Sequence, residues 1–406
     1  MARAAPGVDS DIDPDAGWSL PAWTYADPEF FAAEMARVIR PSWQLVCHAS
    51  DVAGAGDFHT LDYAGESVVV VRGRDGGLNA FINVCRHRGA RLLDGPSGCA
   101  KRLVCPYHAW TYDLDGRLTG VPMRDSYAID PAQHGLVPVE LETWRGFVFV
   151  RLEGGGPSVA AMMAPYEAEI ALYRFEDLRA FGRVTLRPRT VNWKNIGDNY
   201  SDGLHIAVAH PGLKRLMADG YGVEASPHVD KMWGPIVDKP SANPSERAYQ
   251  HFLPQVPHLP PERQRLWTYF KLWPNVAFDI YPDQVDFMQW LPVSPTHTLI
   301  REIAYCLPDT DMPAGWKRAM TAARYCNWRI NRQVNAEDTG LVQRVQDGMA
   351  SASFTVGPLS EQEVALRNFC GKVRHAIPEA RLHHAPAPGW SRRPHPVSGP
   401  ASDGVS

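Results

Sequence analysis

Two short clusters of cysteine and histidine constrain this chain more than any other feature. The first is Cys85-Arg86-His87, and the second, after seventeen intervening residues, is Cys105-Pro106-Tyr107-His108. Two sulfur and two nitrogen ligands can hold either a tetrahedral zinc ion or a two-iron, two-sulfur cluster. Zinc ribbons usually use Cys-x2-Cys pairs, whereas each cluster here pairs one cysteine with one histidine. The spacing therefore favours an iron–sulfur cluster with both thiolates on one iron and both imidazoles on the other.

Composition and charge limit the classes of protein to which the chain can belong. Its 406 residues suffice for two or three domains of ordinary size. A formal net charge of −4 gives no reason to expect binding to nucleic acid or to an anionic membrane. No apolar run approaches the roughly 18 residues of a membrane span, and the first residues lack a signal-peptide pattern, so we expect a cytoplasmic protein. The seven cysteines are widely spread and odd in number, which indicates free thiols and metal ligands instead of disulfides.

The first part of the chain is expected to form a tail, a helix and a small all-β domain. Residues 1–40 form the tail and the helix, with poor order up to about residue 20 and an apolar helical stripe over 28–40. A β domain is predicted over 41–153, because short β-like runs alternate there with the turn signals Gly76-Gly77 and Asp115-Gly116. Both metal clusters would then lie on loops of this domain.

An α+β domain is predicted over 157–384, after the boundary signal at 154–157. Its expected elements are a helix at 159–173, strands at 181–195, 266–273, 276–281, 285–291 and 299–307, and one long helix over 314–352. Aromatic residues crowd 267–290, and some are expected to face a cavity. The stretch 223–262 has little periodicity and is expected to be a long lid or binding loop. Residues 385–406 are expected to form a disordered tail.

A second metal site is indicated by His205 and His210. In one continuous helix they would lie about 140° apart, so they can bind one ion only if the helix ends or bends between them. Pro211 gives a reason for such an end, because the residue before a proline is disfavoured in the α region. Oxygen-activating iron(II) sites commonly add one carboxylate to two histidines. Asp338 is the expected carboxylate, since it lies on the apolar stripe of the long predicted helix, and the neighbouring Glu337 is the alternative.

Both groups of residues resemble the motifs of one family. The Cys-x-His and Cys-x2-His pairs, with the run from Asn192-Trp193-Lys194 to His205 and His210, are similar to those of ring-hydroxylating oxygenase α subunits. This resemblance implies an N-terminal Rieske domain whose [2Fe-2S] cluster is held by Cys85, His87, Cys105 and His108. It also implies a C-terminal catalytic domain of the helix-grip (START-like) type, with an antiparallel sheet, a long helix and mononuclear Fe(2+).

The resemblance assigns further roles near the iron. Asp202, three residues before His205, would share a helix face with it. By resemblance, Asp202 bridges His205 to His108 of the partner subunit and so carries electrons between the two metal centres. Asn199 is expected to lie near the iron. The surroundings of Asp338 also resemble the region of the third iron ligand in the family.

Partners are implied as well. No Gly-x-Gly-x-x-Gly follows a predicted strand, and no plant-type ferredoxin cysteine cluster is present. Electrons from NAD(P)H are therefore expected to arrive through a separate reductase, with or without a ferredoxin. By resemblance the protein is expected to be a homotrimer or a multiple of trimers. The identity of the reductase and the presence of a β subunit stay open.

The sequence leaves the substrate open. Hydroxylation, dihydroxylation and oxidative demethylation with O2 all fit the resemblance, and we favour an aromatic or other hydrophobic small molecule. A betaine-, choline- or carnitine-like quaternary ammonium compound is the alternative; it is weakened because Ile206 stands where such oxygenases carry cysteine. Leu204 also replaces a tyrosine that many relatives have. A Rieske electron-transfer protein without catalysis is the alternative from another class, but it leaves the second iron motif unexplained. A zinc-stabilised lipid-transfer protein would leave Cys85-Arg86-His87 unexplained.

Overall fold

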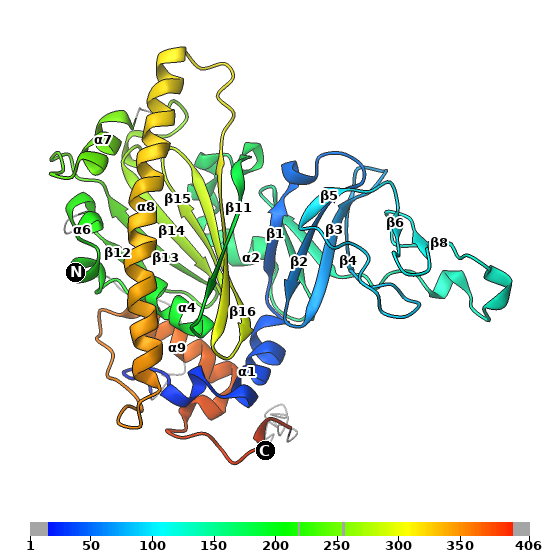
Figure 1. Cartoon of the computed structure of the whole chain (residues 1–406). Coiled ribbons are helices and arrows are strands. Elements are labelled where there is room, and N and C mark those ends of the chain that lie inside the picture. Colours follow the sequence, from blue (N-terminus) through cyan, green and yellow to red (C-terminus); the bar gives the residue numbers. More distant parts are fainter. Residues whose placement is uncertain (1–14, 218–219, 254–255, 393–406) are drawn as a thin grey trace, which may run out of the picture.

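The computed structural model describes residues 15–217, 220–253 and 256–392. Two domains lie side by side in Figure 1: an N-terminal domain that contains strands β1 to β10, and a C-terminal domain built on one large sheet crossed by the long helix α8 (Ala314–Met349). The predicted α+β fold is confirmed. No helix in the described part of the chain is long and apolar enough to cross a membrane.

Three small antiparallel sheets build the N-terminal domain. The turns predicted at Gly76 and Gly116 join neighbouring strands, and both glycines have positive φ (+85° and +83°), a conformation that favours glycine. The loops that carry the two metal clusters follow short strands of this domain. The sheets have the strand orders β4 (Leu78–Ile82), β3 (Glu66–Arg72), β2 (Asp57–Tyr63), β5 (Ser97–Cys99); β1 (Gln44–His48), β10 (Phe147–Arg151), β9 (Glu140–Trp144); and β6 (Leu103–Val104), β7 (Thr111–Tyr112), β8 (Leu118–Gly120).

One seven-stranded antiparallel sheet organises the C-terminal domain. Side chains alternate between its two faces, as they do in any strand. The apolar face packs against the N-terminal domain, for example Phe278 against Phe147 and Phe149. The other face is crossed by α8 (Figure 1). Charged side chains of the sheet, such as Asp279 and Glu302, point into the space between this face and α8. The strand order is β11 (Arg179–Arg189), β17 (His297–Cys306), β16 (Val285–Ser294), β15 (Val276–Ile280), β14 (Leu266–Leu272), β13 (Val229–Pro235), β12 (Gly222–Glu224).

Several predictions of helices, strands and loops in the C-terminal domain are wrong. The strand predicted to run to residue 195 ends at Arg189, because Asn192 caps helix α4 (Trp193–Ser201) and accepts a hydrogen bond from Lys194 N at 2.9 Å. The stretch 223–262 is not a long loop, since it holds β13 of the sheet and helix α7 (Pro244–Phe252). The helix predicted over 159–173 is a series of short turns that includes α2 (Val159–Met163) and α3 (Glu167–Ile170).

The predicted tails are partly ordered. Trp390 is 7% exposed and packs against Trp23 and Phe30. Gly389 N donates a hydrogen bond to Glu29 Oε1 at 2.7 Å. The prediction of a disordered tail from residue 385 is therefore wrong for residues 385–392, as is the prediction of poor order for residues 15–20, where Leu20 is fully buried. Residues 1–14 and 393–406 lie outside the described residues.

The N-terminal segment forms a buried ion pair with α4, the helix that leads to the predicted iron site. Helix α1 (Pro28–Glu34) and the π-helical turn after it lie close to α9 (Val364–Ala376) at one end of the C-terminal domain (Figure 1). Lys194 of α4 is completely buried, and its Nζ donates to Glu34 Oε1 at 2.6 Å and to Thr24 O at 2.9 Å. Burial lowers the pKa of Lys194, and Glu34 opposes this shift. The ion pair therefore joins two segments that are distant in sequence.

Replacing Glu34 with glutamine is expected to destabilise the protein by about 3–5 kcal/mol, because the Lys194 ammonium would remain buried without a counter-charge. The matched control is Asp177→Asn, which breaks the exposed pair between Arg174 and Asp177 (2.6 Å; side chains 54% and 47% exposed). That control should cost less than about 1 kcal/mol. Urea denaturation followed by tryptophan fluorescence measures both. Equal losses in the two variants would contradict the assigned importance of the buried pair.

Candidate metal centres

Two loops of the N-terminal domain present the predicted cluster ligands from the same backbone turn. In each loop the cysteine N–H donates to the carbonyl five residues later: Cys85 to Ala90 at 2.8 Å and Cys105 to Trp110 at 2.8 Å. The N–H four residues after each cysteine donates back to the cysteine carbonyl, at 3.1 and 3.0 Å. That residue has positive φ in both loops, +73° at Gly89 and +56° in the second loop. The sequence pairs are therefore two copies of one turn.

The two histidines of these loops have unsatisfied nitrogens. The rings of His87 and His108 lie 4.7 Å apart, and Nδ1 of each is buried without a hydrogen-bond partner among the described residues. Buried polar atoms rarely lack a partner. Cys85 and Cys105 are also buried, and Trp110 stacks on His87 at 4.8 Å. Two thiolates and two imidazoles are the donor set of a Rieske cluster, so these four residues fit the predicted group.

Tyr112 is a neighbour of the cluster ligands that the sequence did not reveal. Its hydroxyl oxygen lies 3.4 Å from Cys85 Sγ and accepts a hydrogen bond from Arg86 N at 2.9 Å. Hydrogen bonds to ligand sulfur tune the potential of an iron–sulfur cluster. Tyr112 comes from β7, the strand that follows the second loop, so its position depends on the fold and not on the motif spacing.

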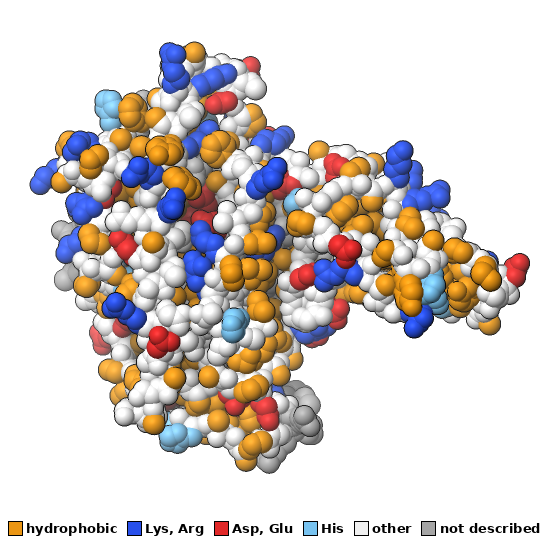
Figure 2. All heavy atoms as spheres, in the orientation of Figure 1, with side chains coloured by type: hydrophobic (Ala, Val, Ile, Leu, Met, Phe, Trp, Pro, Cys, Tyr) orange, Lys and Arg blue, Asp and Glu red, His pale blue; other side chains and the backbone are white. Residues whose placement is uncertain are grey.

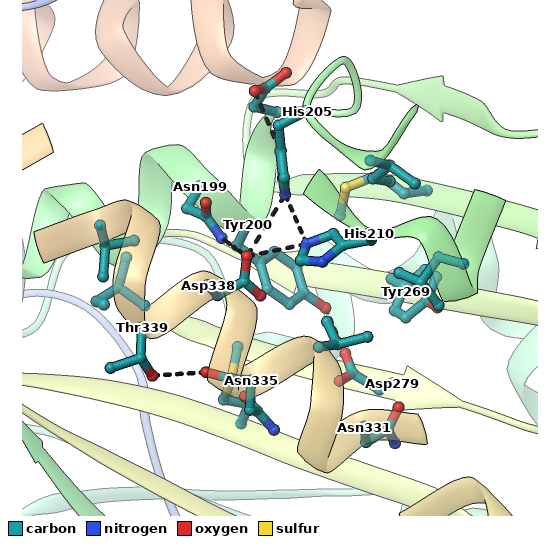
Figure 3. A pocket seen from close by; sticks show the side chains of 18 of the residues that line it. Asn199, Tyr200, His205, His210, Tyr269, Asp279, Asn331, Asn335, Asp338 and Thr339 are labelled. Atoms are coloured by element: carbon teal, nitrogen blue, oxygen red, sulfur yellow. Dashed lines mark hydrogen bonds and ion pairs between the residues drawn. The ribbon is translucent and has the colours of Figure 1, made fainter. Parts of the chain in front are cut away.

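His205, His210 and Asp338, referred to below as the triad, converge in the C-terminal domain. Helix α5 (Ile206–Ala209) ends before His210, whose φ of −115° and ψ of 75° lie outside the helical region, and α6 (Pro211–Met217) follows. His205 Nε2 and His210 Nε2 are 3.1 Å apart, and Asp338 Oδ1 lies 3.0 Å from His210 Nε2 and 3.7 Å from His205 Nε2 (Figure 3). Donors bound to one ion at about 2.1 Å in adjacent positions stand about 3 Å apart. The triad therefore fits a single metal ion.

The outer nitrogen of each histidine contacts a carboxylate. His205 Nδ1 lies 3.2 Å from Asp202 Oδ2, and His210 Nδ1 lies 2.8 Å from Glu337 Oε2. Such contacts orient imidazole ligands and leave Nε2 for the metal. Glu337, the alternative third ligand, thus contacts Nδ1 of His210, whereas Asp338 contacts Nε2 of the same ring. The contact between Glu337 and His210 was not predicted. The two adjacent acids at 337 and 338 are the sequence feature that could have indicated it.

Asp202 reaches His205 by a route that differs from the prediction. The two residues do not share a helix face, because α4 ends at Ser201 and Asp202 is extended, with ψ of 116°. The Asp202 side chain turns back from the loop, and its Oδ1 accepts a hydrogen bond from Leu204 N at 2.7 Å. Since each carboxylate oxygen has two lone pairs, Asp202 keeps capacity for a further donor.

The charges of the triad favour a bound cation. Burial lowers the pKa of His205, but Asp202 and Asp338 outweigh it and raise that pKa to about 9. Burial would raise the pKa of Asp338, yet hydrogen bonds from His205 and His210 bring it below its usual range. Asn199 Nδ2 also donates to Asp338 Oδ1 at 2.9 Å. The carboxylates that raise the pKa of His205 would also stabilise a metal cation, whose binding displaces protons from the imidazoles.

A cavity between α8 and the polar face of the sheet opens at the triad (Figure 3). Its apolar lining comes mainly from Ile, Leu, Met and Val side chains. Acidic atoms are visible in Figure 2 at the bottom of a recess between α8 and β11. Tyr269 and Tyr281, from the predicted aromatic region, line the cavity, whereas Trp267 and Trp290 are fully buried. The tyrosines and sheet acids that line it are Tyr200, Tyr221, Tyr269, Tyr281, Asp279 and Glu302.

Comparison with known proteins gives matches in both domains. A Rieske [2Fe-2S] domain model matches residues 42–141, and a model of the ring-hydroxylating alpha subunit (catalytic domain) matches residues 175–379. The carnitine monooxygenase oxygenase subunit of Escherichia coli (strain K12) is 37% identical over 246 residues, which are 59% of this chain and 63% of that protein, less than two thirds of its length. The carnitine monooxygenase oxygenase subunit of Acinetobacter pittii (strain PHEA-2) is 32% identical over 355 residues, 84% of this chain and 88% of that protein.

A solved structure agrees over a longer span. It is that of a quaternary ammonium Rieske monooxygenase, described with carnitine oxidation by gut microbiota and inter-subunit electron transfer. It superposes with a TM-score of 0.74 at 26% identity and covers 95% of this chain and 100% of that chain. A Rieske domain joined to a catalytic domain with a two-histidine, one-carboxylate triad defines the class of Rieske non-heme iron oxygenases. This chain belongs to that family, as an oxygenase alpha subunit.

Proposed function

We propose that this chain is the terminal oxygenase of a system that oxidises a small organic cation of the quaternary ammonium class with O2. The observation that carries the proposal is the cavity at the triad, which is lined by four tyrosines. Aromatic rings attract cations, and quaternary ammonium groups are commonly bound in this way. The relatives named for carnitine point in the same direction. The cavity thus favours the alternative substrate over the aromatic one that the sequence favoured.

His205, His210 and Asp338 are the residues that would hold Fe(2+), with coordination positions left open. When bound, the iron would supply O2 activation at the triad. Asp202 and Glu337 hold the two imidazoles through their outer nitrogens, and Asn199 holds the Asp338 carboxylate. The apolar side chains of the cavity exclude water around the substrate. In this proposal the side chains position the iron and substrate, and none of them serves as an oxidant.

The N-terminal domain would accept the electrons from the reductase. Cys85 and Cys105 would hold one iron of the [2Fe-2S] cluster, and His87 and His108 the other. Imidazole ligands raise the potential of such a cluster, which suits an intermediate carrier. The electrons would come from NAD(P)H through a separate reductase, with or without a ferredoxin.

We further propose a homotrimer, or a multiple of trimers, with electron transfer between subunits. The two metal centres of one chain lie in different domains: the second cluster loop follows β6, which lies far from α8 in Figure 1, whereas Asp338 lies on α8. Asp202 would receive a hydrogen bond from His108 of the partner subunit. Exposed apolar side chains lie close in sequence to both residues: Val208, six residues after Asp202, is 85% exposed, and Tyr107, next to His108, is 57% exposed. Contacts between subunits would cover these side chains.

Metal content and substrate-dependent O2 uptake test the proposal. We expect about three irons and two acid-labile sulfides per chain. With a surrogate reductase and NADH, carnitine, glycine betaine or choline should stimulate O2 uptake and yield an oxidised product. Aromatic acids and methoxyarenes serve as the comparison set. Two irons per chain would indicate an electron carrier, zinc alone would exclude an oxygenase, and coupled oxidation of the aromatic set alone would overturn the substrate class.

A further inference from the structure

Asp279 presents its side chain to the cavity from the polar face of β15 (Figure 3). The Tyr200 hydroxyl donates a hydrogen bond to Asp279 Oδ1 at 2.5 Å. Directly opposite on β16 is Asp286, whose carboxylate accepts a hydrogen bond from Gln284 Nε2 at 2.8 Å. Asp286 is 6% exposed and does not line the cavity. Two acids thus face the same side of the sheet from neighbouring strands, and of the two Asp279 reaches the cavity.

Asp279 lacks the counter-ion that two other acids on this face, Glu302 and Asp230, have. Glu302 forms an ion pair with Arg187, and Asp230 lies 3.7 Å from Lys271. Within the described parts of the chain, no lysine, arginine or histidine lies within ion-pair distance of Asp279, and burial raises its pKa to about 7. A buried carboxylate is costly unless it is paired. A cation in the cavity would supply the missing charge.

The position of Asp279 relative to the triad suits a small substrate. Tyr200, its hydrogen-bond donor, lies on α4, the helix that leads to the triad. Asn331 of α8 stands seven residues, or about 10 Å, before the triad carboxylate on the same helix. Its Nδ2 donates to the hydroxyl of Tyr281 at 3.1 Å, and Tyr281 follows Asp279 by two residues on the same face of the sheet. Asp279 and the triad line the same cavity, so one substrate molecule can contact Asp279 while one of its carbons lies at the triad.

We propose that Asp279 binds the positively charged nitrogen of the substrate and thereby determines the preference for cations over neutral molecules of the same shape. This inference rests on the proposed function and adds the residue responsible for it. Tyr200 is the positioning residue, because its hydroxyl fixes one carboxylate oxygen. The other tyrosines of the cavity provide rings that attract the cation, but a ring alone carries no net charge.

Calorimetric binding to the enzyme loaded with both metals tests the proposal. The probes are choline, glycine betaine and carnitine, each beside its carbon isostere, in which a quaternary carbon replaces nitrogen. We expect Asp279→Asn to weaken binding of the best cation at least tenfold and to leave the affinity for its isostere within about threefold. Asp286→Asn is the matched control, with the same change one strand away, and should keep the cation preference. Asp279→Ser is the second variant, to be used if the asparagine variant loses iron.

Three results would overturn the proposal in distinguishable ways. If the wild-type enzyme prefers a cation and Asp279→Asn or Asp279→Ser keeps that preference, Asp279 does not determine specificity and the proposed function stands. If the wild-type enzyme shows no preference for any cation over its isostere, the proposed function fails and this inference fails with it. A loss of preference in Asp286→Asn equal to that in Asp279→Asn would assign recognition to the acid pair instead of Asp279.

Discussion

Asp338→Ala is expected to remove the mononuclear iron and abolish product formation, while the visible absorption of the Rieske cluster remains. Asp338 Oδ1 is the carboxylate oxygen that lies 3.0 and 3.7 Å from the two imidazole Nε2 atoms. Without it, two histidines remain to hold the ion. The loss of metal affinity should exceed the roughly 10–100-fold that removal of a hydrogen-bond partner of a ligand costs. Iron analysis beside the cluster spectrum measures the two centres separately.

Glu337→Ala is the matched control for this prediction, because Glu337 is the adjacent acid and contacts the outer nitrogen of His210 at 2.8 Å. It should weaken iron binding by about 10–100-fold, and excess Fe(2+) should restore activity. If Asp338→Ala retains its iron and Glu337→Ala loses it beyond rescue, Glu337 is the ligand and the assignment is reversed.

Asp202→Asn is expected to leave both metal centres filled and yet abolish steady-state turnover. The Asp202 carboxylate holds His205 at 3.2 Å and is proposed to accept a hydrogen bond from His108 of the partner subunit. Asparagine keeps the shape but replaces one oxygen with an amide that donates, so one of the two contacts is lost. Stopped-flow reoxidation of the reduced cluster, with substrate and O2 present, should slow by several orders of magnitude.

Asp198→Asn provides the control for Asp202→Asn. Asp198 lies one helical turn earlier on α4, and its Oδ2 accepts a hydrogen bond from the Tyr25 hydroxyl at 2.5 Å instead of contacting His205. Asparagine keeps an oxygen that can accept the hydrogen bond from the Tyr25 hydroxyl, so the position of α4 should be preserved. This variant should retain turnover. Full activity in Asp202→Asn would refute the bridging role.

The metal motifs could be predicted from sequence because their chemistry is local. A cysteine and a histidine two or three residues apart must lie on one loop, and two such loops were enough to predict the cluster domain. Pro211 likewise indicated that the helix ends between His205 and His210, as the structure shows. The helical period of the long predicted helix placed Asp338 on its apolar stripe, and the family resemblance favoured it over the neighbouring Glu337. In each case a few neighbouring residues carried the information.

Other features depend on contacts between distant segments. β13 has little apolar periodicity, and it forms a strand because it pairs with β14 along its length. Tyr200 and Asp279 are 79 residues apart and meet only after the sheet forms. Asp202 reaches His205 by a loop turn that a helical period does not describe. Asp279 is an acid within the otherwise apolar strand Val276–Ile280, which could have indicated a cavity there. The residues that contact Asp279 could not be identified from sequence.

The shared core of the two domains has a consequence for how electrons reach this enzyme. Trp43, Phe147 and Phe149 of the N-terminal domain are buried in the same cluster as Phe270 and Phe278 of the large sheet. Domains joined by a large hydrophobic interface do not move freely relative to each other. The Rieske cluster therefore cannot swing between a donor and an acceptor, as a hinged carrier would. In the proposed path, a reductase would dock against a stationary cluster, and the distance from that cluster to the iron of the next subunit would be set by how the subunits assemble.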